Sequence, residues 1–226
     1  MRIGIYGGSF NPIHMAHLML AECCREQLRL DRVMLIPAGR PPNKPGCPLM
    51  ASEDRLAMVE LAVAGYPEYV VSREEIDRAR RNDAPGWTTI TVRNLRQEYE
   101  LRHPGEPQEW FLLMGMDMFL TLPQWYEAAE LLRMVMPIGV SRPGYPASDT
   151  ARLFEPLVGT ERAAEISAAQ RVVMPQMDIS GTEIRQRIAA GQSIRWRVPA
   201  AVEAWLQEHR PVISEKTPCC DETRSS

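Results

Sequence analysis

Two histidines, three residues apart, follow a glycine-rich turn near the start of the chain. The segment GIYGGSFNPIHMAH places Gly7 and Gly8 after a short apolar run, and His14 and His17 at the start of the next periodic segment. Residues three apart share one face of a helix, and their side chains lean toward its N-terminus. The free N–H groups and the dipole of that terminus favour phosphate. The pattern predicts a phosphate site in which both imidazoles donate hydrogen bonds that strengthen as charge builds during group transfer.

Two other interpretations of the histidine pair need fewer assumptions. A histidine at a helix start is often a cap or a surface residue, and an isolated pair with this spacing is more often structural than functional. Metal binding is disfavoured because no third ligand is spaced to join His14 and His17. The complete string of strand, Gly-Gly, Asn-Pro, His-x-x-His and helix is what favours the phosphate site.

A second helix start with phosphate-binding chemistry occurs near the other end of the chain. In DISGTEIRQR, Ser180 and Thr182 are good capping residues, and Arg185 follows on the first turn. A guanidinium fork is suited to the β and γ phosphates of a nucleotide. The two helix starts are therefore expected to grip one triphosphate together.

The elements that must position these residues alternate along the chain. Apolar runs favour strands at 2–6, 32–37, 68–72, 109–115, 134–141 and 171–175. Amphipathic segments favour helices at 15–28, 52–65, 88–99, 124–132, 181–190 and 199–208. Ser52 is the expected N-cap of the second helix, and Gly65 is its expected stop signal. This alternation predicts an α/β fold with a parallel sheet and helices on both faces.

The organisation predicted from these elements is one domain over residues 1–208, followed by a polar tail at 209–226 that lacks periodicity and is expected to be disordered. The proline-rich stretch 37–48 is too rigid for a helix and too long for a tight turn, so it is expected to be a functional loop or a lid.

Charge and composition exclude some classes of partner. The chain has 226 residues, with 26 Lys plus Arg against 29 Asp plus Glu, so its net charge is −3. That balance gives no reason to expect nucleic acid or an anionic membrane as partner, whereas a small anion in a local pocket is compatible with it. Neither a secretory signal nor a long apolar run is visible, and the five cysteines lack zinc-site spacing. We expect a cytoplasmic protein with reduced thiols.

These motifs resemble those of a known enzyme group. The string GGSFNPIHMAH resembles the signature of the nucleotidylyltransferase superfamily. The later stretch DISGTEIRQRIAAGQSIRWRVP resembles the Ile-Ser-Ser-Thr-x-Ile-Arg region of bacterial nicotinate mononucleotide adenylyltransferases, with Gly181 in place of the second serine. The resemblance covers Arg2 to about Leu206. It implies a Rossmann-like, doubly wound parallel sheet with a small C-terminal helical segment, and transfer of AMP from ATP to nicotinate mononucleotide in NAD biosynthesis.

The resemblance also implies roles for particular residues. Those implied to be catalytic are His14, His17, Lys44 and Arg185. Those implied to bind ATP are Gly7, Gly8, Ser9, Phe10, Ser180 and Thr182. Those implied to bind nicotinate mononucleotide are Thr88, Gly115, Asp117 and Trp125. No protein ligands for a metal are implied, and Mg²⁺ is expected to arrive with ATP.

Some positions depart from the family pattern, and several alternatives stay open. Asn43 replaces a histidine, Gly86 and Trp87 replace Ser-Tyr, and Arg142 has no assigned role. The alternatives are adenylylation of nicotinamide mononucleotide, phosphopantetheine adenylyltransferase activity, and a non-catalytic nucleotide sensor. A homo-oligomer is compatible with the sequence, which does not determine the oligomeric state.

Overall fold

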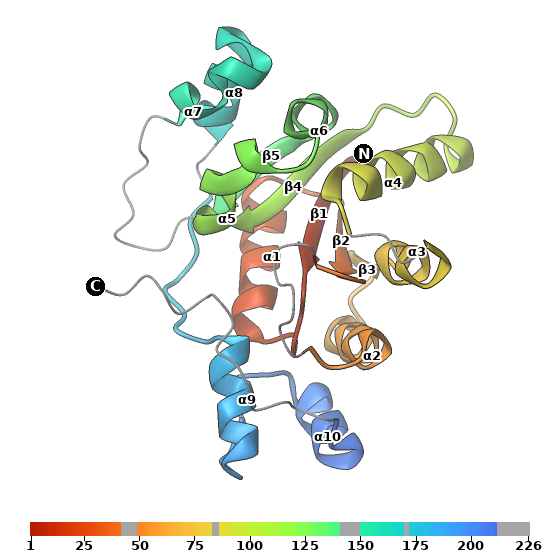
Figure 1. The fold of residues 1–226 in the computed structure, drawn as a ribbon, viewed down its shortest axis with the longest axis vertical. Coiled ribbons are helices and arrows are strands. Elements are labelled where there is room, and N and C mark those ends of the chain that lie inside the picture. Colours follow the sequence, from red (N-terminus) through yellow and green to blue (C-terminus); the bar gives the residue numbers. More distant parts are fainter. Residues whose placement is uncertain (42–48, 83–85, 141–149, 170–171, 212–226) are drawn as a thin grey trace.

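Five short apolar strands form one parallel sheet at the centre of the computed structural model (Figure 1). The structure describes residues 1–41, 49–82, 86–140, 150–169 and 172–211. The strands lie in the order β3-β2-β1-β4-β5. Their bounds are β1 Arg2–Gly8, β2 Arg32–Pro37, β3 Tyr69–Val71, β4 Glu109–Gly115 and β5 Met136–Val140. The chain runs outward from β1 to β3 and then returns to the other side of β1, so strand order reverses between β1 and β4.

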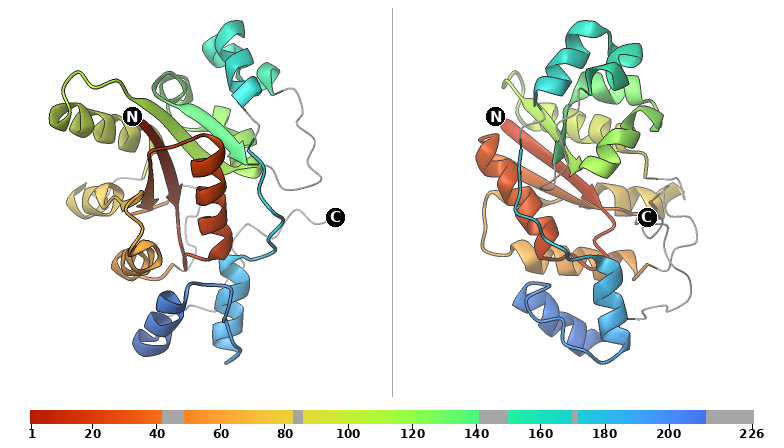
Figure 2. Two further views of the ribbon diagram at one scale, coloured as in Figure 1. Left: turned by 180° about the vertical axis from the view of Figure 1, so that it is seen from behind. Right: turned by 90° about the vertical axis from the view of Figure 1, so that its left-hand side faces the viewer.

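Helices cover both faces of the sheet, because alternate strand residues point to opposite sides and both sides are apolar. One face packs against α1 Met15–Gln27, α2 Ser52–Val63, α9 Gly181–Ala189 and α10 Ala200–His209. The other packs against α4 Thr88–Arg102, α5 Met116–Thr121, α6 Ala128–Met134, α7 Ala151–Val158 and α8 Thr160–Ala169. Figure 2 shows α9 and α10 at one end of the molecule and α7 and α8 at the other. The predicted Rossmann-like α/β fold is confirmed.

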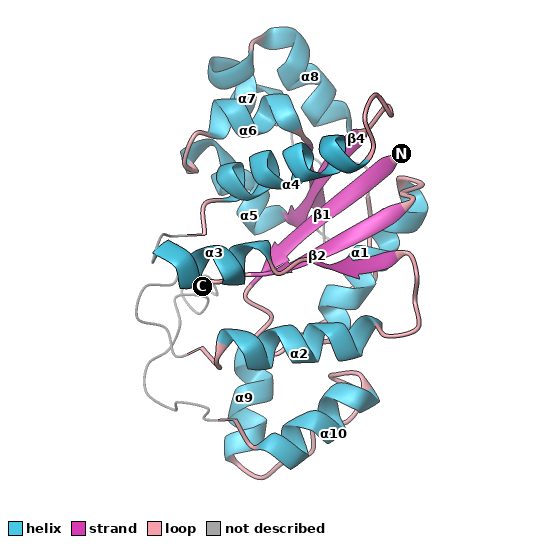
Figure 3. Cartoon of the chain, turned by 90° about the vertical axis from the view of Figure 1, so that its right-hand side faces the viewer, coloured by secondary structure: helices cyan, strands magenta, loops and turns pink. Residues whose placement is uncertain are grey.

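Four helices were not predicted from the sequence. They are α3 Glu74–Asn82, α5, α7 and α8. Helix α3 packs against β2 and α4, and lies between α2 and α4 in Figure 3. It is rich in charged residues, and α5 is only six residues long, so neither gives a clear apolar period.

Three predicted details are wrong. The N-cap of α2 is Ala51, with Ser52 as the first helical residue. The helix predicted over 124–132 is instead a 3₁₀ turn, Leu122–Gln124, followed by α6. Pro123 is the second residue of that turn, and Glu127 has φ 49°, so a left-handed residue separates the two segments.

The third wrong detail is the strand predicted at 171–175, where the described residues 172–175 form no strand and Val173 alone makes an isolated β-bridge. Val172 and Met174 point into the core, while Val173 is 56% exposed. The backbone of Val173 is satisfied by the side-chain amide of Gln27, which donates to its carbonyl at 2.7 Å and accepts from its N–H at 3.1 Å. A side-chain amide of α1 thus fastens this backbone segment at Val173.

Close packing around β1 leaves no room for a side chain at Gly4. A Cβ there would lie 2.8 Å from Leu30 Cδ1 and 3.0 Å from Leu113 Cδ1. We expect Gly4→Ala to lower the free energy of unfolding by roughly 1–3 kcal/mol, the usual effect of overpacking a core. Urea denaturation measures this directly, and an unchanged midpoint would contradict the packing described.

Candidate active site

The two histidines form a stacked pair at the first turn of α1. His14 is the extended residue immediately before the helix, and its backbone N–H donates to His17 Nδ1 at 3.3 Å. The ring centroids are 3.6 Å apart, with 22° between the ring planes. Because Nδ1 of His17 accepts this bond, the neutral ring carries its proton on Nε2. In that tautomer the Nε2–H is a hydrogen-bond donor.

The buried Phe10 side chain packs against the histidine pair. Its side chain is 1% exposed, and its backbone adopts φ 45°. Its ring meets those of Tyr6 and His17 edge-on, with centroids 5.5 Å and 5.1 Å away. The Phe10 side chain is therefore part of the core, so the ATP-binding role predicted for Phe10 could involve only its backbone.

The start of α9 lies directly against the turn that follows β1. The Ser180 hydroxyl caps α9 by accepting from Glu183 N at 3.1 Å. Arg185 Nη1 donates to the Asn11 carbonyl at 2.8 Å, and its Nη2 donates to Thr182 Oγ1 at 3.1 Å. In Figure 1 the first turn of α9 accordingly lies beside the first turn of α1. Two helix N-termini from opposite ends of the chain meet here.

A third group of side chains stands where α4 begins. Trp87, the residue before α4, stacks on Tyr126, with ring centroids 5.1 Å apart and 25° between the planes. Thr89 Oγ1 donates to the Tyr126 carbonyl at 2.6 Å. Thr88 is the first residue of α4 and is partly exposed, as is Trp125. Tyr126 was missed in the sequence, where its only signal is its position next to Trp125.

The end of β4 carries the remaining predicted residues. Gly115 closes the strand, and Asp117 is exposed in the first turn of α5. A Cβ at Gly115 would lie 2.6 Å from Asp117 Oδ1, so the carboxylate folds back over the strand end. The registers Gly8 with Pro37 and Gly115 with Val140 show that the strands end at a common edge. Ligands of open α/β sheets bind at that edge.

A buried carboxyl that the sequence did not single out lies beneath the start of α4. Glu75 of α3 is 8% exposed and accepts a hydrogen bond from Thr91 Oγ1 at 2.9 Å. Burial raises the pKa of Glu75 to about 7, against the opposing effects of Thr91 and Arg78. A Cβ at Gly86 would lie 2.6 Å from Glu75 Oε2, so this carboxyl borders the segment that leads into Trp87.

Sequence and structure comparisons identify the family. The model of the cytidylyltransferase-like family matches residues 5–187. A protein of Synechococcus sp. named probable nicotinate-nucleotide adenylyltransferase is 40% identical over 210 residues, covering 92% of this chain and 96% of the relative. One of Thermus thermophilus with the same name is 38% identical, covering 92% and 98%. The chain belongs to the nicotinate-nucleotide adenylyltransferase family.

A solved structure of the same enzyme type has the same fold. The nicotinic acid mononucleotide adenylyltransferase of Plasmodium falciparum, complexed with APC, superposes with a TM-score of 0.62. It is 15% identical in sequence and covers 92% of this chain and 96% of its own. At that identity the likeness supports the architecture alone.

Two departures from the family pattern now have a packing reason. Gly86 stands in place of the family's serine, and the carboxyl of Glu75 occupies the space that a Cβ would need. At Gly181, which replaces the second serine, a Cβ would lie 3.0 Å from the Asn11 carbonyl oxygen and 3.2 Å from Arg185 Nη1. Both substitutions by glycine accompany a close approach of a neighbouring polar group.

Some predicted features fall outside the described residues. These are Lys44, Asn43, Arg142 and most of the proline-rich stretch 37–48. Their implied roles stay predictions. In the described ranges, no three His, Cys, Asp or Glu side chains are grouped to hold a metal. Likewise, none of the described helices is long and apolar enough to span a membrane.

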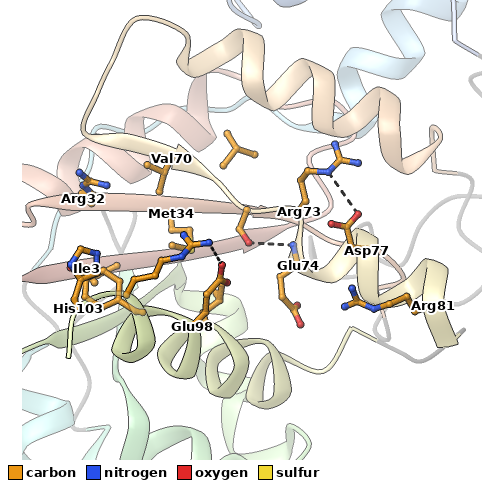
Figure 4. A pocket seen from close by; sticks show the side chains of 15 residues that line it. Ile3, Arg32, Met34, Val70, Arg73, Glu74, Asp77, Arg81, Glu98 and His103 are labelled. Carbon is orange, nitrogen blue, oxygen red and sulfur yellow. Dashed lines mark hydrogen bonds and ion pairs between the residues drawn. The ribbon is translucent and has the colours of Figure 1, made fainter. Parts of the chain in front are cut away.

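A pocket of about 600 Å³ lies away from this site, between α3 and α4 on the sheet face shown in Figure 4. Its floor includes Ile3, Met34 and Val70, and its rim carries ion-paired side chains such as Arg73 with Asp77. None of the residues predicted to be catalytic or to bind substrate lines it. This pocket is therefore separate from the candidate site at the strand ends.

The Glu75 carboxyl gives a pH-dependent stability. Its pKa is about 7 in the folded chain, above the ordinary 4.5, so the folded chain binds more protons than the unfolded chain between these values. The free energy of unfolding therefore falls as pH rises through this window. We expect Glu75→Gln to remove up to roughly 3 kcal/mol of this dependence.

The measurement is urea denaturation of parent and variant between pH 4.5 and 8. As pH rises, the free energy of unfolding of the parent is expected to fall relative to that of Glu75→Gln. The exposed Glu60 on α2 gives a control, Glu60→Gln, whose gap from the parent is expected to stay flat. Parallel curves for parent and Glu75→Gln would contradict the buried titration.

Proposed function

We propose that this chain transfers AMP from ATP to nicotinate mononucleotide, giving nicotinate adenine dinucleotide and pyrophosphate. The observation that carries the proposal is the contact of Arg185 with the Asn11 carbonyl at 2.8 Å, which brings the start of α9 to the turn before His14. Family membership supports the choice of substrates. The reaction needs one triphosphate held between these two helix starts.

The proposed reaction requires the protein chiefly to align the two reactants and to neutralise the charge of the phosphate groups. A phosphomonoester has a second pKa near 6, so the acceptor phosphate is already ionised at neutral pH and needs no general base. Its oxygen forms a bond to the α-phosphorus of ATP, and the bond from that phosphorus to the bridging oxygen breaks. Pyrophosphate leaves with the electron pair. Holding the two reactants in line is the principal contribution.

The residues divide between the two ends of this displacement. His17 offers its Nε2–H, and His14 stacks on it, at the N-terminus of α1. These donors and the helix dipole serve the transferred phosphoryl group. Arg185 and the Ser180–Thr182 start of α9 serve the leaving pyrophosphate. Lys44 is assigned to the same end by family resemblance alone, and Mg²⁺ enters as the MgATP substrate complex.

The acceptor side is assigned to the start of α4 and the end of β4. Trp87 and Tyr126 present stacked aromatic rings there, and Trp125 is the nearby ring expected to stack on a pyridine. Thr88, with the free N–H groups of the first turn of α4, is assigned to the nicotinate carboxylate. Asp117, at the end of β4 after Gly115, is assigned to a ribose hydroxyl.

The choice of acceptor is tested by a product assay. The purified chain, MgATP and one of three acceptors are incubated, and released pyrophosphate is measured. Nicotinate mononucleotide is expected to give the highest kcat/KM, above nicotinamide mononucleotide and phosphopantetheine. A preference for either of the others would replace the proposed acceptor. ATP binding without pyrophosphate release for any acceptor would favour a nucleotide sensor.

The histidine assignment is tested by His17→Ala. Loss of one preorganised donor to the transferred phosphoryl is expected to lower kcat by about 100-fold. A matched control is His103→Ala, which removes a partly exposed imidazole at the end of α4, away from the site, and is expected to leave kcat unchanged. Folded His17→Ala enzyme with nearly parental turnover would show that this assignment is wrong.

A further inference from the structure

A buried arginine lies under the turn that follows β1. Arg55, in the first turn of α2, is 1% exposed and ranks among the largest fully buried side chains of the described residues. Within the described parts of the chain its guanidinium donates to three backbone carbonyls and to no side chain: Ser9 at 2.7 Å, Ala38 at 2.6 Å and Met50 at 3.1 Å. One side chain thus joins the segments that follow β1 and β2 to the segment that enters α2.

The carbonyl of Ser9 is one of three in this turn that accept a hydrogen bond from another part of the protein. The Gly8 carbonyl accepts from Ala38 N at 2.9 Å, and the Asn11 carbonyl accepts from Arg185. A carbonyl oxygen carries negative partial charge, so a turn that binds phosphate must present N–H groups instead. In a planar trans peptide the C=O and N–H point in opposite directions. Holding the Ser9 carbonyl inward therefore turns the Phe10 N–H outward.

The charge of Arg55 has no carboxylate partner at ion-pair distance among the described residues. Burial lowers its pKa to about 10, while the charge of Glu75 acts in the opposite direction, so it stays protonated at neutral pH. A buried cation without a paired anion is costly to maintain. The Arg55 guanidinium contacts the backbone of the turn that is assigned to the triphosphate. A polyanion bound on that turn would offset the cost of burying the Arg55 charge.

We propose that Arg55 is a positioning residue for the triphosphate of ATP, acting by fixing the Ser9 carbonyl inward beneath the turn between β1 and α1. The inference rests on the proposed function only in taking ATP as the ligand of this turn. Arg55 does not touch the reacting atoms. Its effect is on how the N–H groups of the turn meet the phosphate groups.

The test compares Arg55 with an arginine of the same chemistry far from the site. Arg162 of α8 also holds backbone carbonyls, those of Leu132 and Val135, at 3.2 Å and 2.9 Å from Nη2. The variants are Arg55→Met, Arg55→Lys and Arg162→Met. Titration calorimetry gives the Kd of MgATP without acceptor, urea denaturation gives stability, and pyrophosphate release gives kcat and KM.

Arg55→Met is expected to raise the Kd of MgATP by roughly tenfold or more, the scale of losing one charge-assisted hydrogen bond. The KM for the acceptor is expected to change less than about threefold, because the start of α4 is not held by Arg55. Arg55→Lys keeps the charge and loses the fork, and is expected to raise the Kd about fivefold. Arg162→Met is expected to lose stability with an unchanged Kd.

A Kd for folded Arg55→Met within about twofold of the parental value would overturn the proposal. If Arg55→Met does not fold, the same twofold limit is applied to the Kd of MgATP for Arg55→Lys. An equal rise in Kd for Arg162→Met would also overturn it, since the effect would then follow general stability. A parent that binds MgATP but releases no pyrophosphate with nicotinate mononucleotide would refute the proposed function alone, because the Kd comparison still decides the role of Arg55.

Discussion

The contact between Arg185 and the Asn11 carbonyl is the constraint on which the candidate site depends. It joins residues 174 positions apart and brings two helix N-termini to one place. Both termini carry positive partial charge, so their meeting is unfavourable unless negative groups lie between them. Here the Asn11 carbonyl supplies one such group, and a bound polyphosphate would supply more. The close approach also leaves little room for a Cβ at position 181.

The sheet topology explains why these pieces can be brought together. Strand order reverses between β1 and β4, so the segments that leave these two strands diverge and open the edge of the sheet. In the proposed reaction the nucleotide is assigned to the turn after β1 with α1 and α9. The acceptor is assigned to the end of β4, the start of α4 and the Trp87–Tyr126 stack. The in-line displacement needs this division, because attacking and leaving oxygens lie on opposite sides of the phosphorus.

Polar groups buried beneath the site connect its two sides. Arg55 holds the Ser9 and Ala38 carbonyls. Two residues after Ala38, the carbonyl of Arg40 accepts from Gly86 N at 3.0 Å, which ties the exit from β2 to the approach to α4. Glu75 borders the same segment from α3. Buried polar groups that are satisfied in this way specify one arrangement, because any other would leave them unpaired in a medium of low dielectric.

The sequence by itself determined the parallel α/β class, most element positions, the shared face of His14 and His17, and the likeness to one enzyme family. These follow from local periodicity and motif spacing, which depend on residues near one another in the chain. Only the tertiary structure decided that Phe10 is core, that Tyr126 stacks on Trp87, and that Arg55 and Glu75 are buried beneath the site. Each of these depends on contacts between distant segments. The residues next to a charged side chain in the sequence do not show whether solvent or backbone carbonyls will surround it. Only the packing of the folded chain decides between these two environments.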